Sequence, residues 1–384
     1  MTATKKLYEL DSHRREFDAE VICCTKSGDT YEIILNETAF FPEGGGQSAD
    51  TGRIGDVSVF DVQIKDGVIT HYTDLPLTVG ERYQCEIDYE KRFRRMQNHS
   101  GEHIVSGIIH REFGLDNVGF HMGREDVTID VNGILSEKEI RRVEYLANLA
   151  VSENVRIFCE YPTKEELEKL SYRSKLELSD DVRIVNIEGY DSCACCAPHV
   201  SRTGEIGIIK LLDHYKNRDG TRIHMLCGFD ALEDYDARYH MISNAAQSLS
   251  VKQNMLGEAL VRLQNEISEL KQKNYELQSA LTEFKVASIE KTDGNICIFE
   301  AGASQNDMRK LMNACLPKCG GICAVFSGSD EKGYNFVAGS NSVKLKSVAA
   351  DIREKLSAKG GGNDEMIQGS ILASENKIKE YFGV

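Results

Sequence analysis

Two histidines, His99 and His103, stand four positions apart in a segment with helical spacing of apolar residues. Side chains four apart on an α-helix lie on one face about one turn apart, so both imidazoles can reach a single metal ion. Paired surface histidines at this spacing are common, and the pair alone is weak evidence. It predicts a metal site only if further ligands come from elsewhere in the chain.

A second group of possible ligands follows in the run Cys193-Ala194-Cys195-Cys196-Ala197-Pro198-His199. Thiolate sulfur and imidazole nitrogen are the usual ligands of tetrahedral zinc. Cys195 and His199 are therefore predicted to complete a Zn²⁺ site with the two helical histidines. Cys193 or Cys196 could compete for the metal, and a closed structural zinc or a metal-free cluster of reduced thiols stays open at this point.

Two further motifs could contact a substrate. The run from Thr38 to Gln47 contains three consecutive glycines, which let a backbone approach a ligand closely and donate from its N–H groups. Lys91-Arg92-Phe93-Arg94-Arg95 places four cations in five residues at the start of the histidine-bearing helix. A solvated helix face is the default for such a run, and a contact to phosphates is the sharper hypothesis.

The elements that must position these residues follow from periodicity. Short β-branched runs and turn residues predict a small antiparallel β-barrel over residues 1–88. A helix is predicted from 89 to 113 with Gly114 as its stop, and Ser136 with Glu139 has the signature of a capping box for a second helix. With strands at 182–187 and 206–212 on either side of the cysteine-rich loop, residues 89–230 are predicted as an α+β domain.

Residues 231–290 are nearly all helix formers, with Gly257 as the one weak point. Alternating steps of four and three residues predict a coiled-coil arm, with a long helix packed on its own domain as the alternative. The seam of this heptad pattern contains Leu256, Leu260, Leu263, Ile267, Leu270, Asn274, Leu277, Leu281 and Phe284. Residues 291–384 alternate strand-like and helix-like segments and predict a compact C-terminal α/β domain.

Composition limits the function classes. The 384 residues carry 61 acidic and 46 basic side chains, a net charge of −15, which argues against a protein that coats nucleic acid. The sequence has no apolar run of membrane-spanning length and no apolar leader, so a cytoplasmic location with reduced cysteines is expected. The fold class predicted is α+β with several domains.

Four motifs occur in the order seen in AlaX-type trans-editing proteins and in the editing domain of alanyl-tRNA synthetases. They are the Thr38 to Gln47 run, His99-x-x-x-His103, Phe120-His121-Met122-Gly123, and Cys195-x-x-x-His199. The heptad arm and the tail with Gly360, Gly361 and Gly362 are similar to the C-terminal module of alanyl-tRNA synthetases. The chain thus resembles the long class of AlaX proteins over nearly its whole length.

This resemblance implies an editing domain of the tRNA synthetase second-additional-domain type. It implies zinc-dependent hydrolysis in trans of mischarged aminoacyl-tRNA(Ala), chiefly Ser-tRNA(Ala), as translation quality control, with no aminoacylation core. It gives the metal ligands as His99, His103, Cys195 and His199, and the substrate-discriminating or catalytic residues as Thr38, Gly44, Gly45, Gly46, Gln47 and His121. The expected tRNA contacts are Lys91, Arg92, Arg94, Arg95, Gly360, Gly361 and Gly362, and the arm and C-terminal domain are candidate homodimer contacts.

The chain departs from the family where Cys196-Ala197-Pro198 replaces the usual Gly-Gly-Thr between the last two ligands. Two rival interpretations come from other function classes. One is a tRNA- or protein-binding adaptor with a structural zinc. The other is a redox- or metal-responsive protein that uses Cys193, Cys195 and Cys196.

Overall fold

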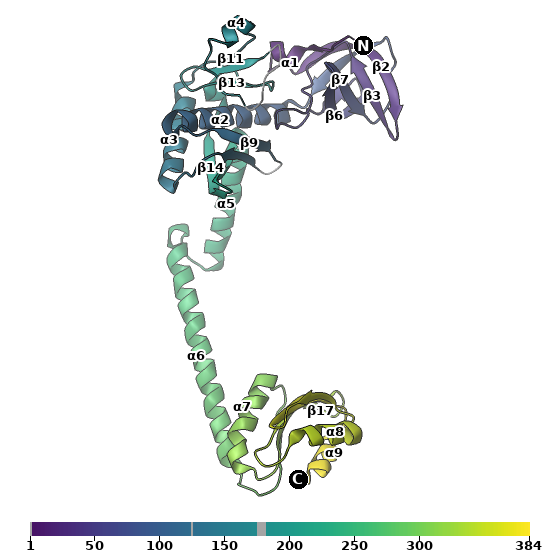
Figure 1. Ribbon diagram of the computed structural model, residues 1–384, viewed down its shortest axis with the longest axis vertical. Helices are drawn as coiled ribbons and strands as arrows, with labels where there is room; N and C mark the ends of the chain where they lie inside the picture. Colours follow the sequence, from purple (N-terminus) through teal and green to yellow (C-terminus); the bar gives the residue numbers. More distant parts are fainter. Residues whose placement is uncertain (1, 124–125, 175–181) are drawn as a thin grey trace. The chain divides into compact units, whose positions relative to one another are not determined.

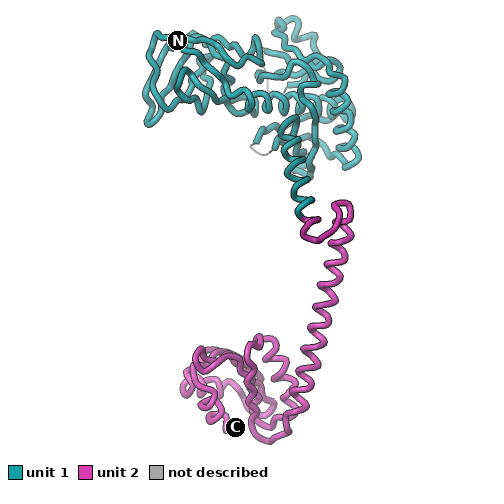
Figure 2. Tube along the Cα trace, turned by 180° about the vertical axis from the view of Figure 1, so that it is seen from behind, with its two compact units in different colours: residues 1–244 teal, residues 245–384 magenta. Residues whose placement is uncertain are grey.

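A computed structural model describes residues 2–123, 126–174 and 182–384. The chain divides into two compact units, residues 1–244 and 245–384 (Figure 2). The finer division at residues 88, 230 and 290 stays a prediction. None of the helices in the described ranges is long and apolar enough to cross a membrane.

The first unit begins with six antiparallel strands that pair in a closed ring, in the order β2-β3-β7-β6-β5-β8 and back to β2. A short parallel pair forms between β1 and β4, and β4 contacts α1 and β2. Figure 1 shows α1 beside the ring. The ring agrees with the antiparallel unit predicted before residue 88. The bounds are β1 (Lys5–Lys6), α1 (Leu7–Leu10), β2 (Glu16–Ser27), β3 (Thr30–Leu35), β4 (Glu37–Thr38), β5 (Gly52–Ile54), β6 (Val57–Lys65), β7 (Val68–Thr73) and β8 (Arg82–Ile87).

Helix α2 (Tyr89–Phe113) is the element that carries the paired histidines. Its start is fixed by Asp88, whose side chain accepts a hydrogen bond from the Lys91 backbone N–H, and it ends at Gly114, which takes the left-handed φ of 65°. Both ends agree with the prediction, because each is marked by a residue whose chemistry suits that position.

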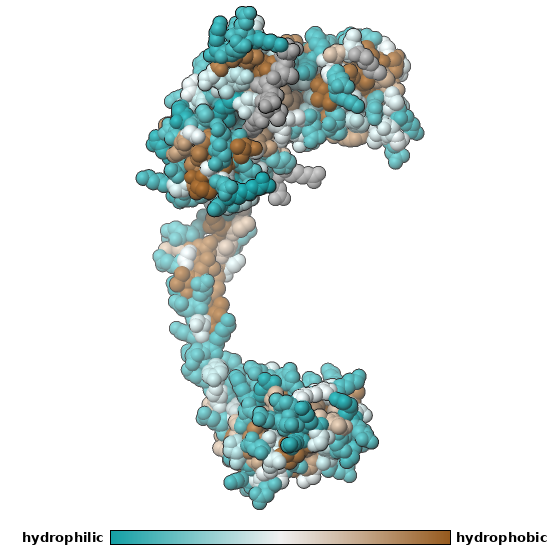
Figure 3. Space-filling view, viewed as in Figure 1, coloured by the Kyte–Doolittle hydropathy of each residue, from teal (hydrophilic) through white to brown (hydrophobic). Residues whose placement is uncertain are grey.

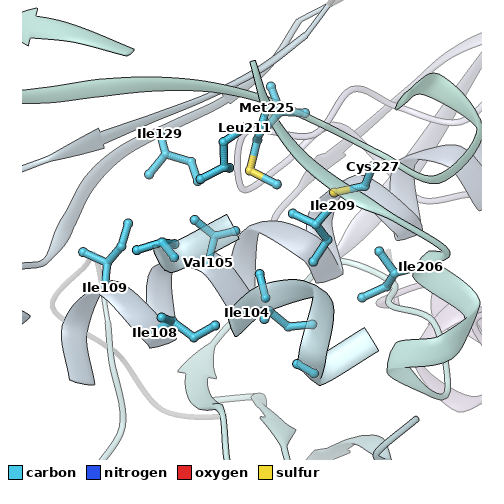
Figure 4. Packing of buried hydrophobic residues seen from close by; sticks show 14 of the residues in the cluster. Ile104, Val105, Ile108, Ile109, Ile129, Ile206, Ile209, Leu211, Met225 and Cys227 are labelled. Atoms are coloured by element: carbon cyan, nitrogen blue, oxygen red, sulfur yellow. The ribbon is translucent and has the colours of Figure 1, made fainter. Parts of the chain in front are cut away.

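One face of α2 packs on a four-stranded antiparallel sheet in the order β14-β15-β10-β9. Figure 4 shows Ile104, Val105, Ile108 and Ile109 of the helix below Ile129, Leu211 and Met225 of the sheet, all in one buried cluster. This core fixes the helix and therefore its two imidazoles. The strands are β9 (Asn117–Met122), β10 (Val127–Val131), β14 (Ile209–Asn217) and β15 (Gly220–Cys227).

The remaining elements of the first unit frame the cysteine-rich loop. Helix α3 (Glu137–Glu153) begins with the predicted capping box of Ser136 and Glu139. The antiparallel sheet β11 (Ile157–Glu160), β12 (Ile184–Ile187) and β13 (Asp191–Ala194) places Cys195 directly after its last strand, and α4 (Lys164–Leu167) lies between β11 and β12 in the sequence. The strand predicted from 206 starts only at Ile209, because Thr203–Ile206 forms a 3₁₀ turn.

The segment predicted as a coiled-coil arm, residues 231–290, is not one continuous helix. Two helices form instead, α5 (Gly228–Ser248) and α6 (Leu256–Ser288), with a short 3₁₀ turn at Gln253–Met255 between them. The break lies at Ser250, which takes a positive φ of 53°. Gly257 lies in the first turn of α6 and does not interrupt that helix. Every seam residue of the heptad pattern lies on α6.

The second unit ends in an α/β fold around a five-stranded sheet in the order β16-β17-β18-β20-β19. Strands β16 and β17 are parallel and the other neighbours are antiparallel. The predicted alternation of strands and helices in this region is confirmed. The bounds are β16 (Ile296–Phe299), α7 (Gln305–Cys315), a 3₁₀ turn (Leu316–Lys318), β17 (Cys323–Ser329), β18 (Gly333–Gly339), α8 (Leu345–Leu356), β19 (Lys359–Gly362), β20 (Met366–Ile371) and α9 (Glu375–Phe382).

Candidate metal centre

Four side chains from two segments converge in the first unit. One ligand atom each of His99, His103, Cys195 and His199 lies within 4.8 Å of the others. The Sγ atom of Cys195 is 3.6 Å from Nε2 of His99 and 3.5 Å from Nε2 of His199. In a tetrahedral site with ordinary Zn–S and Zn–N bonds, the sulfur-to-nitrogen edge is about 3.6 Å. The donor set and its spacing therefore fit zinc.

The outer nitrogen of each imidazole has its own partner. Nδ1 of His99 lies 2.9 Å from Oε1 of Gln47, and Nδ1 of His103 lies 2.9 Å from Oδ2 of Asp191. Because these oxygens only accept, both Nδ1 atoms carry the proton and both Nε2 lone pairs face the cluster. Nδ1 of His199 lies 3.1 Å from Oγ of Ser100, which also accepts the backbone N–H of Val200.

Asp191 is itself held in place. Arg173 donates to its two oxygens over 2.7 and 2.8 Å. Burial alone would raise the pKa of Asp191, but the hydrogen bonds from His103 and Arg173 bring that pKa below its usual value. The carboxylate thus stays charged and orients His103, as outer partners of metal ligands commonly do.

Burial also sets the protonation of the ligands. It lowers the pKa of His199, helped by His103 and His99, so the imidazole is neutral and able to bind a metal. Burial raises the pKa of the Cys195 thiol, so a thiolate at this position depends on a nearby cation. Three neutral imidazoles and one thiolate around a divalent cation leave one net positive charge.

The glycine-rich run forms a tight turn, and Gln47 at its end contacts His99. Gly44 and Gln47 exchange two backbone hydrogen bonds of 3.0 Å, and Gly45 and Gly46 take positive φ values of 60° and 83°. This is the pattern of a two-residue type I′ turn, which glycine adopts at least cost. A Cβ on Gly46 would lie 2.7 Å from the ring of Phe120, and that ring covers His99 at 4.8 Å between centroids.

Thr38 is fully buried beside the ring of strands. Its hydroxyl lies 2.8 Å from Nε2 of His71 and accepts the backbone N–H of Phe40. Nδ1 of His71 donates to the Ile33 carbonyl, and burial lowers the pKa of His71 to about 4. His71 is therefore neutral, its Nε2 accepts, and the Thr38 hydroxyl must donate its proton to it.

The four cations at the start of α2 have different surroundings. Arg92 is fully buried and donates to Asp50 and to the carbonyls of Ala39 and Ser12, which leaves it no surface for a phosphate. The prediction that Arg92 contacts tRNA is therefore wrong, and this side chain has a structural role. The side chain of Arg94 pairs with Asp230, Glu233 and Glu90, so its charge is already compensated.

Lys91, Arg94 and Arg95 border one open hollow of about 930 Å³, together with His121. The same hollow is lined by carboxylates, among them Glu43, Asp61 and Asp126. His121 lies on β9 and lines this hollow, and it is not among the four converging ligands. In the second unit, Gly360, Gly361 and Gly362 belong to the exposed edge strand β19.

The two additional cysteines of the cysteine-rich loop differ in their surroundings. Cys196 is exposed, and a Cβ built on Gly45 would lie 3.7 Å from its sulfur. Cys193 is buried and groups with Asp191 and His103 within 4.8 Å. Neither belongs to the four-residue group that contains Cys195.

Sequence reasoning missed Asp191, Arg173, Ser100 and His71. Ser100 lies inside the His99-x-x-x-His103 motif and Asp191 lies just before the cysteine-rich run, but no periodicity or spacing marks either as a partner of a histidine. The sequence marks His71 only as part of a strand. The pattern His-x-x-Glu-His, which contains Glu102, was the one available signal for a further polar residue near the cluster.

Comparisons with known families agree with the motifs. Residues 182–224, around the cysteine-rich loop, match the family model described as "Threonyl and Alanyl tRNA synthetase second additional domain". Residues 6–91, which contain the ring of strands, match the model described as "tRNA synthetases class II (A)".

Similar proteins cover nearly the whole chain. The alanyl-tRNA editing protein AlaX-L of Pyrococcus horikoshii is 28% identical over 97% of this chain and 96% of its own length. The alanyl-tRNA editing protein Aarsd1 of Mus musculus is also 28% identical, over 97% of this chain and 95% of its own. The alanine–tRNA ligase of Ignicoccus hospitalis is 29% identical over 98% of this chain, which spans only 42% of that ligase. The resemblance to the long AlaX-type alanyl-tRNA editing proteins is thereby confirmed over almost the full length of the chain.

Proposed function

We propose that the protein hydrolyses mischarged aminoacyl-tRNA(Ala) in trans, chiefly Ser-tRNA(Ala), and that this activity depends on Zn²⁺. The observation that carries the proposal is the convergence of three imidazoles and one thiol with zinc-like spacing. That cluster lies in a chain similar over nearly its full length to proteins named as alanyl-tRNA editing proteins.

His99, His103, Cys195 and His199 hold the metal in this proposal, and the metal supplies a positive charge that orients or polarises the ester. Gln47, Asp191 and Ser100 fix the imidazole rings around it. The Thr38 hydroxyl donates to His71 and accepts the Phe40 N–H, which leaves its oxygen one further lone pair as an acceptor. An acceptor at this place suits the hydroxyl of a seryl group and not the methyl of alanine.

The tRNA contacts proposed are Lys91 and Arg95 in the first unit and Gly360, Gly361 and Gly362 in the second, whereas the carboxylates paired with Arg94 make that side chain a poor phosphate contact. Lys91 and Arg95 border the open hollow, where cations can attract phosphates. The three glycines form an exposed sheet edge whose backbone a nucleic acid can approach closely. The same proposal implies a role in translation quality control and a location in the cytoplasm.

The test is deacylation of alanine-specific tRNA charged with Ser, Gly or Ala by the full chain with zinc bound. Ser is expected to be released and Ala retained. Thr38→Val, which removes one hydroxyl at nearly constant volume, is expected to slow Ser release by roughly 10- to 100-fold, the effect of one lost buried hydrogen bond. Thr38→Ser keeps the hydroxyl and serves as the matched control. Survival of all three esters would refute the proposal.

One observation favours a second candidate, a binding adaptor with a structural zinc. Four protein ligands are typical of closed structural sites, whereas catalytic sites usually keep one position open. This adaptor predicts that the zinc-loaded chain binds tRNA and hydrolyses no ester. The same deacylation assay, run with a tRNA-binding measurement, therefore separates the two candidates.

We also propose that α6 pairs with α6 of a second copy as a coiled coil. Figure 3 shows hydrophobic surface along the arm, and all apolar seam side chains on α6 except the half-buried Leu256 are solvent-exposed in the single chain. The seam contains one polar residue, Asn274, and such a residue commonly specifies the register of identical helices. The exposed members of the seam are Leu260, Leu263, Ile267, Leu270, Leu277, Leu281 and Phe284.

Leu270→Lys is expected to convert the dimer to a monomer, with the dissociation constant raised by about 100-fold or more, because each copy loses one buried leucine. Leu270 is 57% exposed in the single chain, so the fold of each copy is unaffected. Val261→Lys is the matched control, since Val261 is 56% exposed on the same helix but lies off the seam. Light scattering after size-exclusion chromatography gives the mass. A wild-type monomer at all concentrations would contradict the pairing.

A further inference from the structure

A buried arginine, Arg183, binds the loop that carries Cys195. It lies directly before β12 and is only 8% exposed. Its Nη1 atom donates to the carbonyl of Cys195 over 2.9 Å and to the carbonyl of Ala197 over 2.8 Å. Its backbone carbonyl accepts the N–H of Cys195 at 3.1 Å. Arg183 therefore fixes the loop through three hydrogen bonds.

Cys195 and Cys196 are adjacent, but their sulfur atoms face different surroundings. Cys195 Sγ lies 3.6 Å from Nε2 of His99, within the four-residue group. Cys196 is exposed, and its sulfur lies beside the glycine-rich turn, 3.7 Å from a Cβ built on Gly45. The two thiols are chemically alike, and zinc accepts a thiolate from either. The loop conformation must therefore decide which sulfur joins the three imidazoles.

The bonds from Arg183 act on the backbone that makes this choice. The two carbonyls bound by Nη1 belong to the peptide bonds that follow Cys195 and Ala197, one on each side of Cys196. Turning Cys196 toward the cluster rotates the first of these peptide units, and its carbonyl then leaves Nη1. A buried guanidinium that loses such a partner is costly, because little water reaches it. The bonds therefore disfavour the alternative loop.

Arg183 is placed at this position at a cost to the fold. Its Nε atom is buried and, within the described ranges, has no hydrogen-bond partner. A buried donor without a partner destabilises a protein. Packing alone therefore does not account for an arginine here, whereas the two bonds to the loop do.

We propose that Arg183 is a positioning residue that selects Cys195 instead of Cys196 as the thiolate ligand of the proposed zinc site, on which this inference rests. It acts through the loop carbonyls and contacts neither the metal nor the substrate. This role has a consequence beyond stability. When the two bonds to the loop are removed, zinc is held less tightly and either thiol reaches it.

Arg183→Met tests the proposal in the full chain, because methionine keeps much of the side-chain length and donates no hydrogen bond. A chromophoric chelator gives the zinc affinity, and mass spectrometry after N-ethylmaleimide treatment of the zinc-loaded protein identifies the modified cysteines. In the wild type, Cys195 is expected to be protected and Cys196 to react. In the variant, zinc affinity is expected to fall by roughly 10- to 100-fold and protection to be shared between the two thiols. A wild-type protection pattern overturns the proposal.

Arg173→Met is the matched control. Arg173 is another largely buried arginine near the cluster, and its side chain donates to Asp191, the partner of His103. Its loss is expected to weaken zinc binding as well, but Cys195 is expected to stay the protected thiol. If both arginine variants expose Cys195 equally, weakened zinc binding alone explains the exchange and the proposal is overturned.

Cys195→Ser gives a second test, which leaves Arg183 in place and applies even if Arg183→Met does not fold. When Co²⁺ replaces zinc, a sulfur-to-cobalt charge-transfer band reports thiolate coordination. The band is expected in the wild type and absent in Cys195→Ser, because Arg183 holds Cys196 away from the metal. Persistence of the band in Cys195→Ser overturns the proposal. If the wild type binds neither metal, the proposed zinc site fails instead.

Discussion

Cys195→Ser is expected to weaken zinc binding by more than about 100-fold. This exceeds the roughly 10- to 100-fold loss that is typical when a residue hydrogen-bonded to a metal ligand is removed. The hydroxyl of serine stays protonated near neutral pH and is a poor ligand for zinc beside three imidazoles. In the proposed deacylase, Ser-tRNA(Ala) hydrolysis falls together with zinc occupancy. Zinc content after dialysis and competition with a chromophoric chelator give the affinity, and the deacylation rate gives the activity.

The neighbouring thiol offers a matched control for this prediction. Cys196→Ser makes the same chemical change one residue away, at an exposed side chain outside the four-ligand group. Zinc affinity and hydrolysis are expected to stay at wild-type values. If Cys196→Ser releases zinc and Cys195→Ser does not, Cys195 is not a ligand and the cysteine-rich loop binds the metal in a different register.

Sequence alone predicted those elements whose ends carry distinctive residues. The end of α2 follows from Gly114, and the start of α3 follows from Ser136. The break between α5 and α6 has no such marker. It depends on a positive φ at Ser250 and on backbone bonds from Ser250 and Val251 back to the last turn of α5, a conformation that serine does not signal.

The candidate site shows the same limit. The four converging ligands were predicted because zinc restricts residue type and spacing. Their outer partners Gln47, Asp191 and Ser100 come from three separate segments that meet only in the folded chain. Arg92 was misassigned because a run of cations carries no information on burial, and it is the inward-facing member of that run.

Arg92 and Asp50 form a buried ion pair that ties the glycine-rich run to α2. Both side chains are almost completely inaccessible, and Arg92 Nε donates to Asp50 Oδ2 over 2.9 Å. The same oxygen accepts the backbone N–H of Phe41 at 2.7 Å, and Arg92 also donates to the Ala39 carbonyl. The pair therefore holds both the segment that follows Thr38 and the one that follows Gln47.

Arg92→Met is expected to destabilise the first unit by about 3–5 kcal/mol, because it removes the cation that donates hydrogen bonds to the buried Asp50 carboxylate and leaves only Arg95, whose Nη1 lies 3.6 Å from Asp50 Oδ1. The double variant Arg92→Met with Asp50→Leu is expected to recover much of this loss, since no uncompensated charge is left inside. Urea denaturation of the full chain, followed by circular dichroism, measures both free energies of unfolding.

Lys91→Met is the matched control for the buried pair. Lys91 is the adjacent cation and pairs with Asp88 at 2.7 Å, but its side chain is 58% exposed, so its loss is expected to cost at most about 1 kcal/mol. An equal effect of the two single variants would show that Arg92 is solvated in solution, which would return it to the predicted tRNA contacts. A large loss for Arg92→Met alone, with zinc still bound, would instead establish that the glycine-rich turn depends on a charge pair and not on its glycines alone.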